Sequence, residues 1–437
     1  MAMQKFTTNS YYNDSEMIFV PSSLGGVIDL DKNCKFESML RRIMTIPEYW
    51  RTTRVQQLGF VEYDIPAARH SRFEHQVGAY DLHRTLIYHS NRNFGKSRAR
   101  AMTFNITEQA AQAAAFIHDI GHVFPGHPFE RAMKKMFPDS YQSHEKWGIE
   151  IIERSEIKKT LESYDTGFAN KVLDILAEDN LSNNIWQQVH SGNLNVDTMD
   201  YLIRDQSRTQ QSGSWDKFLV HKIIENIKFD KDDNNRDRII LLPGAEIDYM
   251  RMLTVRGEMY NNVYMGGKSA AAEAFLPRLL DEIQKAVEVG KLKSDNPFVK
   301  FIKSRGTDYD AYLGLTGDAF NALVDECIRV SELLQLPELL NIAKRYKNVS
   351  ANFTTIDDIK IKSSTEFYMS EKDAKEGIEH EGGIVKDIEI PLYNMEKPEV
   401  FCMLNPTAEP VPFSEAFPEF VDKKIRILKG YFMSKEK

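Results

Sequence analysis

The sequence predicts a mainly α-helical protein with a smaller C-terminal α+β lobe. Over most of the first 346 residues, apolar side chains recur at the spacing of amphipathic or buried helices. Beyond about residue 350, short alternating or β-branched runs are separated by glycine and proline, which is typical of strands. With 437 residues, the chain can bury a large core and divide into two or three lobes.

The first expected helices lie around the histidine-rich part of the chain. A helix is expected over 34–50, stopping near Pro47, and another over 74–89. The clearest signals bound an alanine-rich helix over 109–120, for which Thr107 is the candidate N-cap.

Later helices are expected from about His144, over 171–178, from about 248 to 285 and over 318–346. The polar segment 291–317, interrupted by glycine and proline, predicts a linker.

Strands are expected over 358–361, 387–390 and 400–404. The elements together predict a helical core over 1–290, a linker and helical extension over 291–349, and an α+β lobe over 350–437.

Composition favours a protein of the cytoplasm and disfavours one whose main task is holding nucleic acid. The formal net charge of −8 disfavours a main role in holding nucleic acid, which requires a basic surface, but allows a small anion in a local basic pocket. The three cysteines are scattered without metal-binding or disulfide spacing, as expected in a reducing compartment. No apolar run is long enough to span a bilayer, and the N-terminus lacks the apolar region of a signal peptide.

Histidines are concentrated in one part of the chain, since eight of the 11 lie between His70 and His144. At the end of the alanine-rich helix, His118 is followed by Asp119. Adjacent helical residues diverge by about 100°, so both side chains can reach one point only near the helix end, where a metal could accept them. Alone, such a dipeptide is more often a helix-terminal aspartate with a solvated histidine than a metal site, so other residues must support the prediction.

Three other polar groups strengthen the prediction of a site. Residues 69–75 (RHSRFEH) place two imidazoles, two guanidinium groups and a carboxylate at the start of a helix. Residues 121–127 (GHVFPGH) add two histidines in a glycine- and proline-containing loop, and 195–205 (NVDTMDYLIRD) place three aspartates and an arginine among apolar residues.

These motifs resemble the HD-domain phosphohydrolases and, among them, the deoxynucleoside triphosphate triphosphohydrolases of the SAM-and-HD-domain type. H-x-R-F-E-H at 70–75, H-D-x-G-H at 118–122, H-E at 144–145 and D-x-x-D-Y-x-x-R-D at 197–205 occur in the family's order. The segment 55–59 (VQQLG) and the C-terminal part from Val400 are similar as well.

The resemblance implies a metal site formed by His75, His118, Asp119 and Asp197. Imidazole and carboxylate ligands suit Mn, Fe, Ni, Zn or Mg, and the sequence does not distinguish among these divalent metals.

The resemblance also implies catalytic and phosphate-contacting roles for three histidines. His127 is the expected general acid, His122 the expected α-phosphate contact, and His144 a third catalytic histidine. Asp200 could be catalytic, or it could orient an arginine or cap a helix.

Substrate contacts are implied at eight positions. Gln57 and Asp205 match residues that bond the 3′-hydroxyl, Tyr201 lies where a 2′-hydroxyl would clash, and Arg72 would hold phosphate. The remaining implied contacts are Leu58, Arg256, Tyr264 and Lys268.

Two positions depart from the animal members of the family. The spacing from Tyr264 to Lys268 is one residue longer, and Thr198 occupies the place of a lysine that reaches toward phosphate. Loss of that cation could weaken triphosphate binding or alter the choice of substrate.

The implied activity is hydrolysis of a deoxynucleoside triphosphate to deoxynucleoside and inorganic triphosphate. Alternatives are another HD phosphohydrolase (a nucleotidase, a cyclic-nucleotide phosphodiesterase or a single-strand nuclease) and a nucleotide sensor without turnover. The resemblance further implies a homo-oligomer, a tetramer or larger, and an activating nucleotide between subunits.

Overall fold

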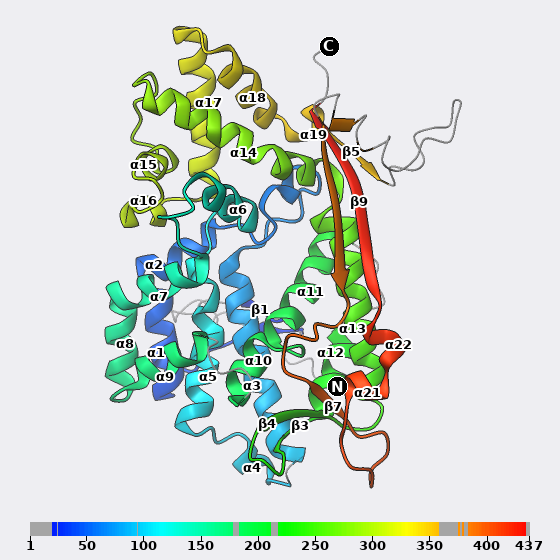
Figure 1. Ribbon diagram of the computed structural model, residues 1–437. Helices are drawn as coiled ribbons and strands as arrows, with labels where there is room; N and C mark the ends of the chain where they lie inside the picture. Colours follow the sequence, from blue (N-terminus) through cyan, green and yellow to red (C-terminus); the bar gives the residue numbers. More distant parts are fainter. Residues whose placement is uncertain are drawn as a thin grey trace, which may run out of the picture.

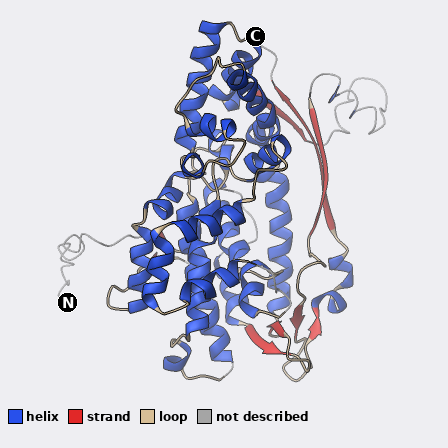
Figure 2. Cartoon of the chain, turned by 60° about the vertical axis from the view of Figure 1, so that its left-hand side comes forward, coloured by secondary structure: helices blue, strands red, loops and turns tan. Residues whose placement is uncertain are grey.

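The computed structural model describes residues 20–433, apart from 24, 94, 178–182, 211–216, 358–374, 376–377 and 380–382. Helices make up most of this part of the chain (Figure 2), which confirms the predicted mainly α fold. The strand expected over 358–361 lies outside the described residues. Among the described helices, none is both long and apolar enough to cross a membrane.

The first part of the chain consists of a short strand pair and a series of helices. These elements are β1 (Val20–Pro21), β2 (Val27–Ile28), α1 (Lys35–Met44), α2 (Pro47–Trp50), η1 (Arg51–Arg54), η2 (Gly59–Tyr63), α3 (Arg72–Asn93), α4 (Arg98–Ala101), α5 (Ile106–Ile117), η3 (His118–Gly121), α6 (His127–Met136), α7 (His144–Arg154), α8 (Glu156–Tyr164) and α9 (Phe168–Leu176).

Helix boundaries here follow local chemistry. The helix expected over 34–50 is divided, because α2 begins anew at Pro47, and proline fits the first turn of a helix, where its missing N–H is not needed. The prediction of Thr107 as N-cap is wrong. Asn105 caps α5 by accepting from two backbone N–H groups, while the Glu108 carboxylate bonds back to the Asn105 N–H.

The second part of the chain contains the longest helices and most of the strands. Its elements are α10 (Ile185–Ser191), α11 (Val196–Thr209), α12 (Lys217–Glu225), β3 (Ile227–Lys231), β4 (Asp237–Leu241), α13 (Ala245–Met259), the π-helical turn η4 (Tyr260–Tyr264), α14 (Gly267–Glu288), α15 (Pro297–Lys303), α16 (Tyr309–Leu313), α17 (Gly317–Leu334), α18 (Pro337–Lys347), α19 (Val349–Asn352), β5 (Phe353–Asp357), β6 (Ile384–Pro391), β7 (Val400–Cys402), β8 (Val411–Pro412), α21 (Phe413–Ala416), α22 (Pro418–Val421) and β9 (Lys424–Met433).

The segment expected as a linker differs from the prediction. Residues 291–317 contain the short helices α15 and α16, and their Phe298, Phe301 and Tyr312 side chains are fully buried. The sequence conceals these helices because each has only a few apolar residues between breakers. The proposed domain boundaries near 290 and 350 stay predictions.

The helix expected over 318–346 is broken once. Helix α17 ends where Gln335 adopts a left-handed conformation with φ of 56°, and α18 begins at Pro337.

Two sheets join distant parts of the sequence. One has the order β3-β4-β7-β8, in which β7 runs parallel to β4, and the other has the order β5-β9-β6. Strands β6 and β9 run side by side past α11 and α13 (Figure 1). The predicted strands 387–390 and 400–404 fall in β6 and β7, although β7 ends at Cys402. The hairpin β3–β4 was not predicted.

The buried apolar residues form two clusters. The larger cluster joins α1 and α5–α9 to α14–α18, and the smaller joins α11–α13 to β3, β4 and β7. Helix α3 contributes to both, with Val77 in the larger cluster and Leu86 in the smaller. The polar motifs of α3, η3 and α11 therefore meet between the two clusters.

Candidate metal centre and active site

The His-Asp pair lies where α5 tightens into a 3₁₀ turn. Helix α5 ends at Ile117, three residues before its expected end, and His118 and Asp119 begin η3. The turn is pressed against α7: a Cβ on Gly121 would lie 1.9 Å from the His144 carbonyl oxygen. The absence of a side chain at Gly121 therefore lets the His-Asp turn approach the helix that begins with His144.

Three predicted metal ligands come together from three helical elements. The His75 Nε2 atom of α3 lies 2.8 Å from Asp197 Oδ1 of α11 and 3.2 Å from His118 Nε2 of η3. The distance from His118 Nε2 to Asp197 Oδ1 is 3.6 Å. One potential ligand atom of each residue lies within 4.8 Å of the other two. This arrangement fits a divalent cation bound by two imidazoles and a carboxylate.

The two imidazoles are oriented by bonds on their other ring nitrogens. His118 Nδ1 lies 2.9 Å from the Ala115 carbonyl oxygen, which can only accept, so Nδ1 carries the proton and Nε2 presents a lone pair. His75 Nδ1 lies 2.9 Å from Asp200, and Asp200 is held by two bonds from Arg204. Such partners fix the tautomer of metal-binding histidines.

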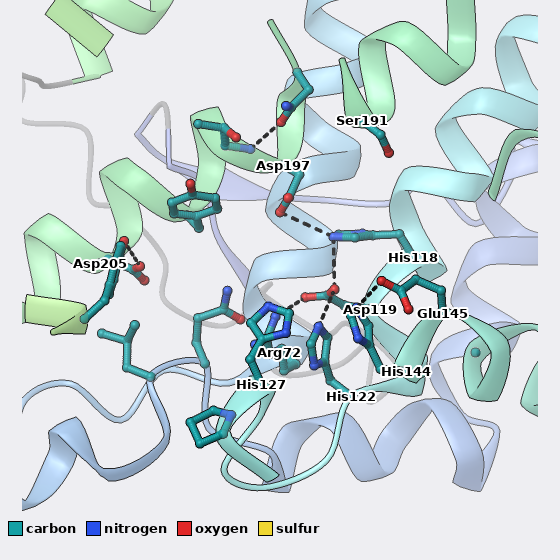
Figure 3. A pocket seen from close by; sticks show the side chains of 18 of the residues that line it. Arg72, His118, Asp119, His122, His127, His144, Glu145, Ser191, Asp197 and Asp205 are labelled. Carbon is teal, nitrogen blue, oxygen red and sulfur yellow. Dashed lines mark hydrogen bonds and ion pairs between the residues drawn. The ribbon is translucent and has the colours of Figure 1, made fainter. Parts of the chain in front are cut away.

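Asp119 lies beside this group and links it to the guanidinium group of Arg72. Its Oδ2 accepts from Arg72 Nη1 at 2.5 Å and lies 3.6 Å from His75 Nε2. Its Oδ1 lies 3.6 Å from His118 Nε2 and 3.4 Å from His122 Nε2 (Figure 3). Asp119 can therefore contact either a cation held by His75 and His118 or a group bound beside His122.

Charge interactions keep the carboxylates of the site ionised. Burial alone would raise the pKa of Asp119, but Arg72 and the neighbouring imidazoles lower it well below its usual range. The pKa of Asp197 is likewise lowered by bonds to His118 and His75, despite burial. The site therefore has negative charge available for a cation.

A second polar cluster lies next to the first. His144 Nδ1 is 2.7 Å from Glu130 Oε2, and His127 Nδ1 is 3.7 Å from the same oxygen. The His122 and His144 rings stack with centroids 3.9 Å apart. One potential ligand atom each from His127, Glu130 and His144 also lies within 4.8 Å of the others.

The histidines of this cluster differ in electrostatic environment. Burial and the nearby Arg72 lower the pKa of His122 well below its usual range. Burial would also lower the pKa of His144, but its bond to Glu130 raises it. A neutral imidazole thus stacks on one that is more readily protonated, and this pair supplies both an acceptor and a proton donor.

Nearly all predicted site residues line one cavity of about 500 Å³, a size typical of small-molecule sites. The predicted residues that line it are Gln57, Leu58, Arg72, His118, Asp119, His122, His127, His144, Asp197, Tyr201, Asp205, Arg256 and Tyr264. His75 is fully buried behind the lining. Lys268 is exposed at the start of α14 and does not line the cavity, so the structure does not bring it to the site.

Asp205, Tyr201 and Tyr264 line another part of the cavity, here called the far wall. Tyr264 donates to Asp205 Oδ2 at 2.6 Å, and His70 Nε2 lies 2.7 Å from Asp205 Oδ1. The Tyr201 ring meets that of Tyr264 edge-on, with centroids 6.3 Å apart. The buried Oε1 of Gln57 has no hydrogen-bond partner within the described part of the chain.

Sequence reasoning did not identify Glu130, Tyr260 or Lys397 as site residues. Glu130 could have been found, because it follows His127 by three residues on a helix, a spacing that places both on one face. Lys397 could not have been found in this way. It precedes β7, and only the pairing of β7 with β4 brings this distant part of the chain to a cavity lined by α11.

Comparison with known proteins identifies the domain that contains this site. The HD domain family matches residues 72–203, so an HD domain is present over that range, which includes every residue of both polar clusters.

The sequence relatives match only part of this chain. The uncharacterized protein YwfO of Bacillus subtilis is 24% identical over 250 residues, covering 57% of this chain and 53% of its own length. A mouse protein named deoxynucleoside triphosphate triphosphohydrolase SAMHD1 is 29% identical over 135 residues, which cover 30% of this chain and 20% of that protein. The chain thus spans only about half of YwfO and a fifth of the mouse protein.

Among solved structures, a phosphohydrolase from Bacteroides thetaiotaomicron has the same fold. The two align with a TM-score of 0.72 over 96% of this chain and all of that one, at 19% sequence identity. Because the alignment covers 96% of this chain, the shared fold extends well beyond residues 72–203 of the HD domain.

Proposed function

We propose that this protein is a metal-dependent phosphohydrolase that converts deoxynucleoside triphosphates to deoxynucleosides and inorganic triphosphate. The observation that carries the proposal is one cavity in which a His-His-Asp group adjoins three further histidines and the guanidinium group of Arg72. Cation-binding groups and anion-binding groups thus face the same space, as phosphate ester hydrolysis requires.

His75, His118 and Asp197 would hold the divalent metal, with Asp119 as the fourth ligand. A divalent cation there supplies Lewis acidity for phosphoryl transfer, and Mn, Fe, Ni, Zn and Mg are all compatible with the ligands. Arg72 is suited to hold the α-phosphate beside this group, because its buried Nε has no partner within the described chain while Nη1 is fixed by Asp119.

The histidine cluster would supply the proton that the leaving 5′-oxygen takes up. Water attacks the α-phosphorus, the bond from that phosphorus to the 5′-oxygen breaks, and the leaving oxygen takes a proton. His127 is the proposed donor, since its exposed ring faces the cavity and Glu130 lies 3.7 Å from Nδ1. His122 contacts the α-phosphate, and His144 stacks on His122 to fix that ring.

The far wall would recognise the sugar. Asp205 and the unpartnered amide oxygen of Gln57 are suited to accept from a 3′-hydroxyl. The Tyr201 ring narrows the space where a 2′-hydroxyl would lie, so a ribose would clash with it. Arg256, Tyr264 and Leu58 line the remaining wall and would contact the rest of the nucleotide.

The partial similarity to the mouse protein SAMHD1 supports this choice of substrate, because that protein's name states this activity. From the resemblance of the motifs to the triphosphohydrolase family we further propose a homo-oligomer, a tetramer or larger, that is activated by a nucleotide bound between subunits.

Product analysis tests the proposal. The purified chain is incubated with Mn and each deoxynucleoside triphosphate, singly and then mixed, and the products are separated by chromatography. We expect deoxynucleoside and intact triphosphate, with activity only in mixtures if a nucleotide activator is required. Monophosphate or orthophosphate products, or nucleotide that survives unchanged, would contradict the triphosphohydrolase assignment.

A further inference from the structure

The C-terminal part of the chain places a lysine in the cavity. Lys397 belongs to the connection between β6 and β7, about 200 residues after Asp197, and lines the same cavity as His118 and Asp197. Its ammonium group donates to the Ser191 carbonyl oxygen at the end of α10.

The partner of this ammonium group, Ser191, follows a residue that contacts a proposed metal ligand. His190, the residue before Ser191, packs edge-on against His118, with ring centroids 5.2 Å apart. In the view of Figure 3, Ser191 and Arg72 lie on opposite sides of His118. Besides Arg72, the wall of this cavity therefore includes the cation of Lys397.

The connection that carries Lys397 is fixed to the helix that carries Asp197. The Asn193 side chain, two residues before the cap of α11, donates to the carbonyl oxygens of Asn394 at 2.9 Å and of Pro398 at 3.2 Å. It also accepts from the Asn394 N–H at 3.2 Å. Asn193 thus holds the backbone on both sides of Lys397, an arrangement that positions a functional side chain accurately.

Helix α11 itself supplies no cation to the cavity. The side chains that it presents to the cavity are Asp197, Thr198, Tyr201 and Asp205, which include two carboxylates and no basic group. A polyphosphate that extends past Asp197 would meet the carboxylates of this helix, so cations from other elements would have to offset their charge.

We infer that Lys397 is a phosphate-binding residue of the active site, supplied by the C-terminal part of the chain. Lysine binds phosphate oxygens as a compact positive charge, and its bond to the Ser191 carbonyl oxygen holds this charge at the cavity wall. The inference rests on the proposed function for the identity of the substrate, but triphosphate binding itself requires no turnover.

The test compares three variants of the full-length chain in the presence of Mn. Lys397→Met removes the charge and keeps most of the stem, and Lys397→Arg restores a cation. Lys424→Met is the matched control, because Lys424 belongs to the same C-terminal part but forms an exposed ion pair with Glu389 on β6 and β9. The binding of inorganic triphosphate is measured by calorimetry, and the kinetics are measured with a deoxynucleoside triphosphate.

For Lys397→Met we expect triphosphate affinity to fall about tenfold, because a charge-assisted hydrogen bond is lost. The Michaelis constant should rise by a similar factor, kcat should change by less than about threefold, and Lys397→Arg should recover part of the loss. Binding of a deoxynucleoside without phosphate should not change. A purely structural role would instead weaken deoxynucleoside binding and lower the melting temperature.

Unchanged triphosphate affinity in Lys397→Met would overturn the inference, as would the absence of triphosphate binding to the unaltered chain. If the unaltered chain binds triphosphate through Lys397 but hydrolyses no nucleotide, the proposed activity is wrong and the phosphate site stands.

Discussion

At the scale of single residues, Tyr201 is the proposed selector of deoxyribose. Its ring lies between the carboxylate of Asp205 and the metal-binding end of α11, where it meets Tyr264 edge-on. Tyr201→Ala should open space for a 2′-hydroxyl and raise the ratio of ribonucleotide to deoxyribonucleotide kcat/KM about tenfold or more. Tyr201→Phe keeps the ring and should keep the selectivity. Equal ratios in the alanine variant and the unaltered chain would remove Tyr201 from sugar recognition.

Glu273 of α14 provides a residue-scale test of stability. Burial raises its pKa to about 7, although Lys386 and Arg131 act in the opposite direction. Its ordinary pKa is 4.5, so between that pH and about 7 the folded chain binds more protons than the unfolded chain. The free energy of unfolding therefore falls as pH rises through this window, and the loss is complete above it.

Glu273→Gln should remove this dependence, because glutamine does not titrate. The melting temperature of the variant, relative to the unaltered chain, should thus rise between about pH 5 and about pH 8. A constant difference across that range would show that the Glu273 carboxyl group does not have the raised pKa.

At the scale of elements, the contact between η3 and α7 determines how the two polar clusters meet. A Cβ on Gly121 would lie 1.9 Å from a backbone oxygen of α7, whereas a Cβ on Gly148 would meet only atoms at 3.5 Å or more. Gly121→Ala should therefore destabilise the fold by about 3 kcal/mol or more and move His144 away from His122. Gly148→Ala, from the other side of the same contact, should fold and turn over normally.

Denaturant unfolding and activity of these two glycine variants give the comparison. Similar stability in both would mean that the contact between η3 and α7 is looser than described.

The limits of sequence prediction also lie at this scale. Long periodic helices such as α3 and α5 follow from apolar spacing, and the His-Asp pair follows from its place at a helix end. The N-cap of α5 was misplaced by two residues because asparagine and threonine both cap helices, and only the bonds to Asn105 decide between them. Helices α15 and α16 were missed because tertiary burial, and not periodicity, stabilises them.

For the site, too, short local motifs could be predicted from the sequence, whereas contacts between distant residues could not. Motifs within 70–75, 118–122 and 197–205 were recognisable because each is a short stretch with unusual chemistry. The cavity that joins them could not be derived from spacing, since it depends on packing α3, η3 and α11 between two apolar clusters. Lys397 illustrates the limit, because an isolated lysine in a polar stretch carries no local signal.

At the scale of the whole molecule, the candidate metal site lies where the two apolar clusters meet. His118 extends from α5, most of whose buried residues belong to the larger cluster, and Asp197 lies on α11, between Val196 and Met199 of the smaller. His75 lies on α3, which contributes to both. A cation bound by these three residues would therefore link the clusters and stabilise the folded chain as a unit.

Metal binding should consequently raise the melting temperature. At a free metal concentration of about 100 times the dissociation constant, binding stabilises the folded state by about 2.7 kcal/mol. For a chain of this length, that corresponds to roughly 3 °C. Removing metal with a chelator should lower the melting temperature and abolish turnover, and adding Mn back should restore both.

Variants of the ligands identify where that stabilisation arises. His118→Ala and Asp197→Ala should stay folded, retain little metal by elemental analysis, and lose both turnover and the shift on adding Mn. His221→Ala is the control, because His221 lies on α12 and does not line the cavity, so its metal content and shift should match those of the unaltered chain. If His118→Ala keeps full metal content and activity, the assigned ligands are wrong, and the cluster of His127, Glu130 and His144 becomes the place to look for the metal.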